Sequence, residues 1–319
     1  MKKVSCFMIV RNVLSQGYPF LEAIAQALPV CDEFLISDGM SDDGTYQLLE
    51  RAARVNKKIR LFREEWQRGS FHEELREATN RLLRKCQGDY VFYVQANEVV
   101  HEESWKYLKQ LPEIWPEAIT FSFPYLLVFR HLRFHEQYRL RYAKRLDYIE
   151  AIYDAWALGL STRFVIKELL SSLFRPRQLA RILYKGVHAI YADTGGITKL
   201  TVPVILPQPI YRYQAVFLGD PIAKELERTR RWGGGRGREE LERKLSQLSE
   251  CDSEEKLLEI VKSARKVMRA RGHQVPDYPE GLMRIPPERH PRIMRGLLED
   301  KTSCRYYVRE EIFDILREV

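Results

Sequence analysis

The sequence predicts an α/β protein built on a Rossmann-like, mostly parallel sheet with helices on its faces. Two observations in the first 110 residues support this. Short apolar runs alternate with segments whose apolar side chains recur at helical spacing. In addition, stretches rich in polar and acidic residues follow the apolar runs at 33–36 and 90–94 directly. The chain has 319 residues, 45% of them hydrophobic and 30% charged, which is enough apolar material for a sizeable core.

The predicted elements of this first part alternate regularly. Apolar runs predict four strands, over residues 4–10, 33–37, 59–62 and 90–94. Helical spacing between them predicts three helices, with apolar faces over residues 20–28, 48–55 and 71–82. Strands that alternate with helices of this length form a parallel sheet with right-handed crossovers.

The pattern becomes looser after residue 118. The run 119–129 is a strand candidate bent at Pro124, and 139–145 alternates basic and apolar residues as a half-buried strand does. A glycine-rich break at 233–237 is the clearest linker, and charged helical patterns follow it, the last near 310–316. We therefore expect three parts, residues 1–118, 119–231 and a helical C-terminal extension over 232–319.

Charge and cysteine content narrow the function classes. Residues 121–220 carry 14 Lys and Arg against 7 Asp and Glu, so this third could face diphosphates, an anionic membrane surface or nucleic acid. The five cysteines are scattered, without metal-ligand spacing, as in a reducing compartment such as the cytoplasm. No apolar run is long enough to span a bilayer, and 4–10 reads as a strand and not as a signal peptide. Membrane contact is expected to be peripheral, on the inner face.

Polar stretches at the strand ends indicate a ligand site. The first predicted strand ends in Arg11 and Asn12, the second runs into Ser37 to Thr45, and the fourth into Gln95 to Glu98. In an open α/β sheet, ligands bind in the crevice outside the carboxyl ends of the strands. Carboxylates at two such ends suggest a nucleotide and a metal ion as ligands.

These stretches resemble the nucleotide-sugar-binding half of a family 2 glycosyltransferase with the GT-A fold. Residues Asp38 to Thr45 are similar to the motif that follows the second strand of that family. Gly69 and the helical pattern to Asn80 precede Gly88-Asp89-Tyr90, as in the family, and Gln95 to Glu98 stand where it has an Asp-x-Asp motif. The resemblance ends near residue 110. It implies that 1–118 bind the nucleotide-sugar and that 119–231 form the acceptor side of the same domain.

The resemblance also implies roles for individual residues. Asp38 would accept a hydrogen bond from the N3–H of uracil or from a ribose hydroxyl. The residues expected to bind the nucleotide with it are Arg11, Asn12, Gly39 and Gln95.

The departure from the family motif lies at Gln95 and Asn97, which replace the two aspartates that hold a divalent cation, Mn²⁺ or Mg²⁺. Three outcomes stay open. In the first, Asn97, Glu98 and a downstream ligand such as His188 hold the metal. Alternatively, arginines neutralise the diphosphate without a metal, or nucleotide binding persists without turnover. Basic residues that could reach phosphates are Arg139, Arg141, Lys144 and Arg145.

An inverting transfer needs a base that deprotonates the acceptor hydroxyl. The family supplies an Asp or Glu from its second half, and the candidates here are Asp193, before a Gly-Gly pair, and Asp154, beside Trp156. No motif fixes either position.

The sequence therefore predicts an inverting glycosyltransferase that moves a sugar from a nucleotide-diphosphate donor, a UDP-sugar, to a lipid- or glycan-linked hydroxyl. The alternatives are a GT-A-fold binding or scaffold protein with weakened catalysis and, with less support, a basic α/β protein that binds nucleic acid.

Overall fold

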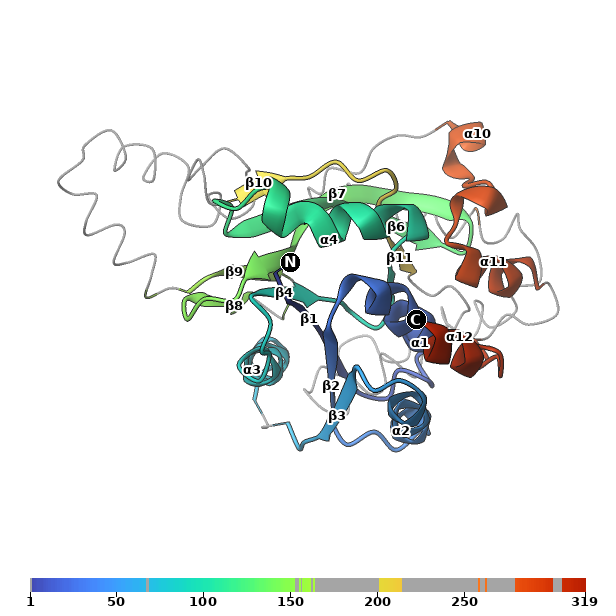
Figure 1. The fold of residues 1–319 in the computed structure, drawn as a ribbon. Coiled ribbons are helices and arrows are strands. Elements are labelled where there is room, and N and C mark those ends of the chain that lie inside the picture. Colours follow the sequence, from blue (N-terminus) through green and yellow to red (C-terminus); the bar gives the residue numbers. More distant parts are fainter. Residues whose placement is uncertain are drawn as a thin grey trace.

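A computed structural model of the chain describes residues 2–66, 69–152, 155, 157–161, 163, 201–213, 258, 262, 279–300 and 306–319. The described residues up to 93 form a parallel half-sheet in the order β3-β2-β1-β4, with helices in the crossovers (Figure 1). The strands are β1 (Val4–Val10), β2 (Glu33–Asp38), β3 (Ile59–Arg63) and β4 (Tyr90–Tyr93). The helices are α1 (Phe20–Ala27), the 3₁₀ turn η1 (Leu28–Val30), α2 (Thr45–Val55) and α3 (Phe71–Leu83).

Later segments extend the same sheet. Beyond β4 its order continues β7-β6-β11-β5, with β10 paired to β6. The added strands are β5 (Glu98–Val99), β6 (Thr120–Phe129), β7 (Leu132–Lys144), β10 (Thr201–Pro203) and β11 (Ile210–Tyr213). A separate hairpin joins β8 (Ile149–Ile152) to β9 (Ala157–Leu160). The remaining elements described are η2 (Glu102–Ser104), α4 (Trp105–Ile114), α10 (Glu280–Met283), η3 (Pro287–Arg289), α11 (Arg292–Glu299) and α12 (Ile312–Glu318).

The predicted fold class is confirmed. The strand pairs within the described sheet are mostly parallel, with β4–β7, β6–β7 and β11–β5 antiparallel, and helices flank it. The strand expected over 119–129 is β6, and the final helix expected near 310–316 is α12. The glycine-rich break at 233–237 lies outside the described residues, and so do nearly all of the charged helical patterns expected between it and the final helix. The domain boundaries stay a prediction.

Side-chain alternation along the strands divides the core into two layers. Val4, Cys6 and Met8 of β1 pack on one face of the sheet, while Phe7 packs on the other with Leu35 of β2. Figure 1 places α1, α2 and α12 on the first side of the half-sheet and α3 on the opposite side. Within the described residues, no helix has the length and apolar character needed to cross a membrane.

The C-terminal segment is attached to the half-sheet by polar contacts as well as by apolar packing. Asn56 Nδ2 donates to the Leu316 carbonyl over 2.7 Å. Arg51 Nη2 lies 2.6 Å from Glu310 Oε2 on the surface. In the interior, Tyr306 Oη donates to the buried Glu22 carboxylate over 2.9 Å. Residues 306–319 therefore complete the layer that α1 and α2 begin.

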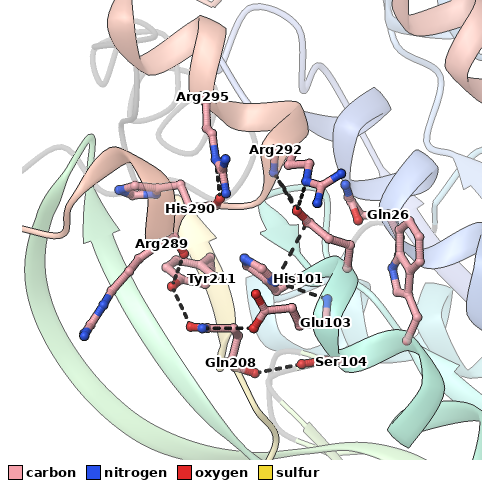
Figure 2. Close-up of polar contacts among 12 residues, drawn as sticks. Gln26, His101, Glu103, Ser104, Gln208, Tyr211, Arg289, His290, Arg292 and Arg295 are labelled. Carbon is pink, nitrogen blue, oxygen red and sulfur yellow. Dashed lines mark hydrogen bonds and ion pairs between the residues drawn. The ribbon is translucent and has the colours of Figure 1, made fainter.

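A second attachment centres on His290, which is fully buried between η3 and α11. Its Nδ1 lies 2.9 Å from Tyr213 Oη, and its ring lies 5.5 Å from that of Tyr211, centroid to centroid. Figure 2 shows His290, Tyr211 and His101 gathered where β11 meets η2 and the segment that leads into α11. Burial lowers the pKa of His290 to about 4 and also lowers the pKa of His101.

This buried imidazole predicts a pH dependence of stability. In the unfolded chain it binds a proton near pH 6.5, whereas in the folded chain it stays neutral until about pH 4. The free energy of unfolding should therefore fall as the pH drops from 6.5 to 4, by about 3 kcal/mol in total. Urea unfolding at pH 7, 5.5 and 4.5 measures this. His290→Asn, which can keep the contact with Tyr213, should flatten the profile, and an unchanged profile would contradict the assignment.

Candidate functional site

The ends of three parallel strands meet at one edge of the sheet. Val10 of β1 pairs with Asp38 of β2, which in turn pairs with Arg63 of β3. On the other side of β1, Phe7 pairs with Tyr93 of β4. β2 and β4 both flank β1, so their axes lie roughly 10 Å apart. The structure thus brings Asp38 and the turn after β4 to the same edge.

Asp38 is the most informative residue at this edge. Its side chain is fully buried at the carboxyl end of β2. Oδ2 accepts a hydrogen bond from Ser41 N over 3.0 Å and lies 3.5 Å from Arg63 Nε. Oδ1 is also buried but has no hydrogen-bond partner in the described part of the chain. A buried carboxylate oxygen without a donor is costly, so Oδ1 is an acceptor suited to a ligand N–H or O–H.

Arg11 and Asn12, both predicted to bind the nucleotide, hold the loop that follows Asp38. Arg11 Nη1 donates to the Gly39 carbonyl over 2.7 Å. Asn12 N donates to Ser41 Oγ, and Asn12 Oδ1 accepts from Asp42 N, each over 2.9 Å. Asn12 has φ 50°, a left-handed conformation that Asn tolerates better than most residues. These contacts fix the two strand ends against each other.

The start of α2 completes this loop. Asp43 Oδ1 accepts from Thr45 N over 2.9 Å, and its Oδ2 accepts from Ser15 N over 2.8 Å. Gly44, with φ 97°, supplies the left-handed residue before the helix. Asp43 therefore holds the loop in front of α2, while Gly44 is the N-cap residue of that helix.

Two residues of this edge, Arg63 and Trp66, were not identified from the sequence. Arg63 donates through Nη2 to the Ser41 carbonyl over 3.1 Å, and its Cζ lies 4.2 Å above the ring centre of Tyr46. Trp66 packs so close to Gly39 that a Cβ there would lie 2.6 Å from Trp66 Cε2. Arg63 ends the predicted third strand, so sheet register could have placed it beside Asp38. Nothing in the sequence pattern pointed to Trp66.

The turn after β4 is built around a buried ion pair. Glu98 Oε1 accepts from Arg141 Nη2 over 2.6 Å, and Glu98 Oε2 accepts from Arg141 Nε over 3.1 Å. Gln95 N also donates to Glu98 Oε2 over 3.1 Å, and Gln95 Nε2 donates to the Ala155 carbonyl over 3.2 Å. Asn97 is buried, and its carbonyl accepts from Tyr213 N over 2.9 Å.

Two arginines surround Glu98. Arg141 is fully buried, and its Cζ lies 5.0 and 5.7 Å from the ring centres of Tyr93 and Tyr125. Arg212 pairs with Glu98 across β5 and β11, so both side chains lie on the same face of that antiparallel pair. Burial lowers the pKa of Arg212, while Glu98 raises it and Arg141 lowers it. The surroundings of the turn are therefore rich in positive charge.

The structure corrects the prediction that Lys144 and Arg145 reach the phosphates of a bound donor. β7 runs antiparallel to β4 and places Lys144 opposite Tyr90, at the amino end of that strand. Arg145 Nε donates to the Gly88 carbonyl over 2.7 Å at the same end. Lys144 and Arg145 therefore lie at the edge of the sheet opposite Asp38. Arg139 has a hydrogen bond to Gln137 on its own strand.

The predicted metal ligands Asn97 and Glu98 do not form a fitting donor set in this conformation. Both Glu98 oxygens already accept from Arg141. Among the described residues, no group of three or more His, Cys, Asp and Glu side chains is placed to hold a metal ion. His188, Asp193 and Asp154 lie outside the described residues, so their predicted roles stay predictions.

Comparison with known proteins gave similarities to solved structures alone. No model of a known protein family matches the chain, and no curated protein matches its sequence. TarS residues 1–349 of S. aureus are 21% identical over 39% of this chain and 35% of that chain, with a TM-score of 0.30. The same TarS segment in complex with UDP-GlcNAc is 21% identical over 39% of this chain and 34% of that chain, with a TM-score of 0.29.

The mannosyltransferase PcManGT from Pyrobaculum calidifontis, in complex with GDP-Man and Mn²⁺, is 21% identical over 38% of this chain and 35% of that chain, with a TM-score of 0.30. The chain thus spans about a third of the length of these structures.

The Glu98–Arg141 pair predicts a large stability effect. Glu98→Gln leaves the buried Arg141 guanidinium without this carboxylate, so the free energy of unfolding should fall by about 3 kcal/mol, measured by urea unfolding. Asp314→Asn removes an exposed pair with Arg317 and should change it by no more than about 0.5 kcal/mol. Equal effects of the two substitutions would show that burial does not strengthen the Glu98–Arg141 pair.

Proposed function

We propose that the chain is a glycosyltransferase similar to family 2 with a GT-A fold, and that it binds a nucleotide-diphosphate sugar at the edge formed by β1, β2 and β4. The resemblance of residues 38–45 and 88–98 to that family supports this reading. The position of residues 38–45 and 95–98 also supports it, because they follow the carboxyl ends of β2 and β4, the two strands that flank β1. We take a UDP-sugar as the first donor to test.

The single observation that carries the proposal is the buried Oδ1 atom of Asp38, which lacks a partner among the described residues. A donor ring N–H would satisfy it. Uracil and guanine each carry such a ring N–H, whereas cytosine and adenine do not. Arg63, which is partly exposed beside Asp38, supplies donors for a neighbouring carbonyl. The pair therefore suits a base with a ring N–H next to a carbonyl group.

The surrounding loop would hold this acceptor in place before the ligand arrives. Ser41 N and Arg63 fix Oδ2, and Asn12 and Arg11 fix the loop to the end of β1. A site whose polar groups are already oriented pays less entropy on binding. Nucleotide binding should therefore depend on Asp38 more than on the exposed residues of the same loop.

In the proposed reaction, a hydroxyl of a lipid- or glycan-linked acceptor attacks the anomeric carbon with inversion. The bond from that carbon to the diphosphate oxygen breaks, and the nucleoside diphosphate leaves with the bonding electrons. The acceptor proton passes to a carboxylate base, for which Asp193 and Asp154 stay the candidates.

A second function, nucleotide-sugar binding without turnover, is favoured by one observation. The neutral Gln95 and Asn97 stand where the family has its motif aspartates. Release of nucleoside diphosphate in the presence of acceptor distinguishes the two functions, because a binding protein releases none.

Asp38→Asn tests the proposed site. An amide has one oxygen and one NH₂ group, so its NH₂ would face either the ligand N–H or Ser41 N, and neither of these can accept a hydrogen bond. UDP affinity should therefore fall about 10- to 100-fold, as expected for a lost hydrogen bond to a charged group. Calorimetry with UDP, GDP, CDP and ADP measures this and should rank the first two above the others.

The matched control is Asp42→Asn in the same loop, since Asp42 is exposed and its backbone N–H, which the substitution keeps, donates to Asn12 Oδ1. It should bind UDP like the parent chain. Nucleotide affinities that are the same in Asp38→Asn as in the parent chain would overturn the proposed site.

A further inference from the structure

The turn after β4 offers a divalent cation poor ligands. Mg²⁺ and Mn²⁺ in such sites are held by carboxylates together with the donor phosphates. Here the two positions carry Gln95 and Asn97, whose amides are neutral. Gln95 is oriented by its own bonds, from Nε2 to the Ala155 carbonyl and from its backbone N to Glu98.

Glu98, the carboxylate next to Asn97 in the sequence, is already paired with the Arg141 guanidinium. It is buried in β5, and both of its oxygens accept hydrogen bonds from Arg141 at 2.6 and 3.1 Å. Such a two-pronged pair matches the guanidinium fork closely. Moving Glu98 to a metal would leave the buried guanidinium without this partner, which is strongly destabilising.

The local field has the wrong sign for a cation and the right sign for phosphate. Arg141 of β7 is paired with Glu98, and Arg212 of β11 stands opposite Glu98 in the pairing of β11 with β5. Tyr213, the neighbour of Arg212, bonds through its N–H to the Asn97 carbonyl over 2.9 Å. Both arginines therefore come from strands that contact the turn directly, so their charge acts at the turn. Like charges in a water-poor site repel strongly.

We propose that this turn receives the donor diphosphate without a divalent cation, and that Arg141 and Arg212 supply the positive charge that a metal supplies elsewhere. Arg212 acts on the phosphates, and Glu98 keeps Arg141 in place behind the turn. This inference rests on the proposed nucleotide-sugar binding and adds to it the means of charge neutralisation.

The test is calorimetry of the full chain with UDP and with GDP, first in EDTA and then in Mn²⁺ or Mg²⁺. The same dissociation constant within about twofold in both conditions supports the proposal. Binding that needs the metal, or tightens tenfold or more with it, overturns the proposal and leaves the proposed function standing. No binding of either nucleotide in any condition overturns both.

Variants of Arg212 and of the turn, with one control, sharpen the test. Arg212→Gln should weaken UDP binding at least tenfold and leave uridine binding unchanged, because uridine has no phosphate, and Arg212→Lys should restore part of the loss. Arg60→Gln is the matched control, since Arg60 pairs with Glu33 near the amino end of β3. Gln95→Asp combined with Asn97→Asp should create a metal dependence that the parent chain lacks. Equal UDP and uridine losses in Arg212→Gln would contradict a role at the phosphates.

Discussion

The buried pair of Glu98 and Arg141 is the interaction on which the centre of this fold depends. It joins the short strand β5 to the long strand β7, and Gln95 N adds the turn after β4 to the same carboxylate. Charges removed from water in this way stabilise a structure only when their hydrogen bonds are well formed, and here the guanidinium fork meets the carboxylate on both oxygens. The pair thereby fixes the geometry of the turn at the candidate site.

The same constraint determines what the site can do. A carboxylate held by an arginine is a poor metal ligand, whereas an arginine held by a carboxylate is an oriented positive charge. At the end of β2, Asp38 has one oxygen held by Ser41 and Arg63. Its other oxygen is buried and has no hydrogen-bond partner among the described residues. One edge of the sheet thus presents a hydrogen-bond acceptor suited to a base and positive charge suited to phosphates.

The sequence predicted the half-sheet well, because each of its strands is a short apolar run that local periodicity reveals. It also placed Asp38 and Asn97 after the second and fourth strands, whose carboxyl ends lie at the same edge of the sheet. It missed α4, in which Leu108 and Leu111 are fully buried but Pro112 interrupts the helical pattern. It also expected the strand at 139–145 to begin later than β7 does, because the pairing of β7 with β6 extends to Leu132.

The ion pair of Glu98 with Arg141 was not predictable from the local sequence pattern. Its partner is 43 residues away and is brought to it by the antiparallel pairing of β7 with β4, which no spacing in the sequence reveals. The same pairing carries Lys144 and Arg145 to the far edge. Trp66 was not identified from the sequence for a similar reason, since its contact with Gly39 depends on the path of the chain after β3.

The most direct measurement is a crystal structure of the chain with bound UDP. The account predicts the uracil N3 atom within hydrogen-bond distance of Asp38 Oδ1 and the diphosphate at the turn of Gln95 to Asn97. UDP bound elsewhere on the molecule, or at this edge with its uracil turned away from Asp38, would contradict the account.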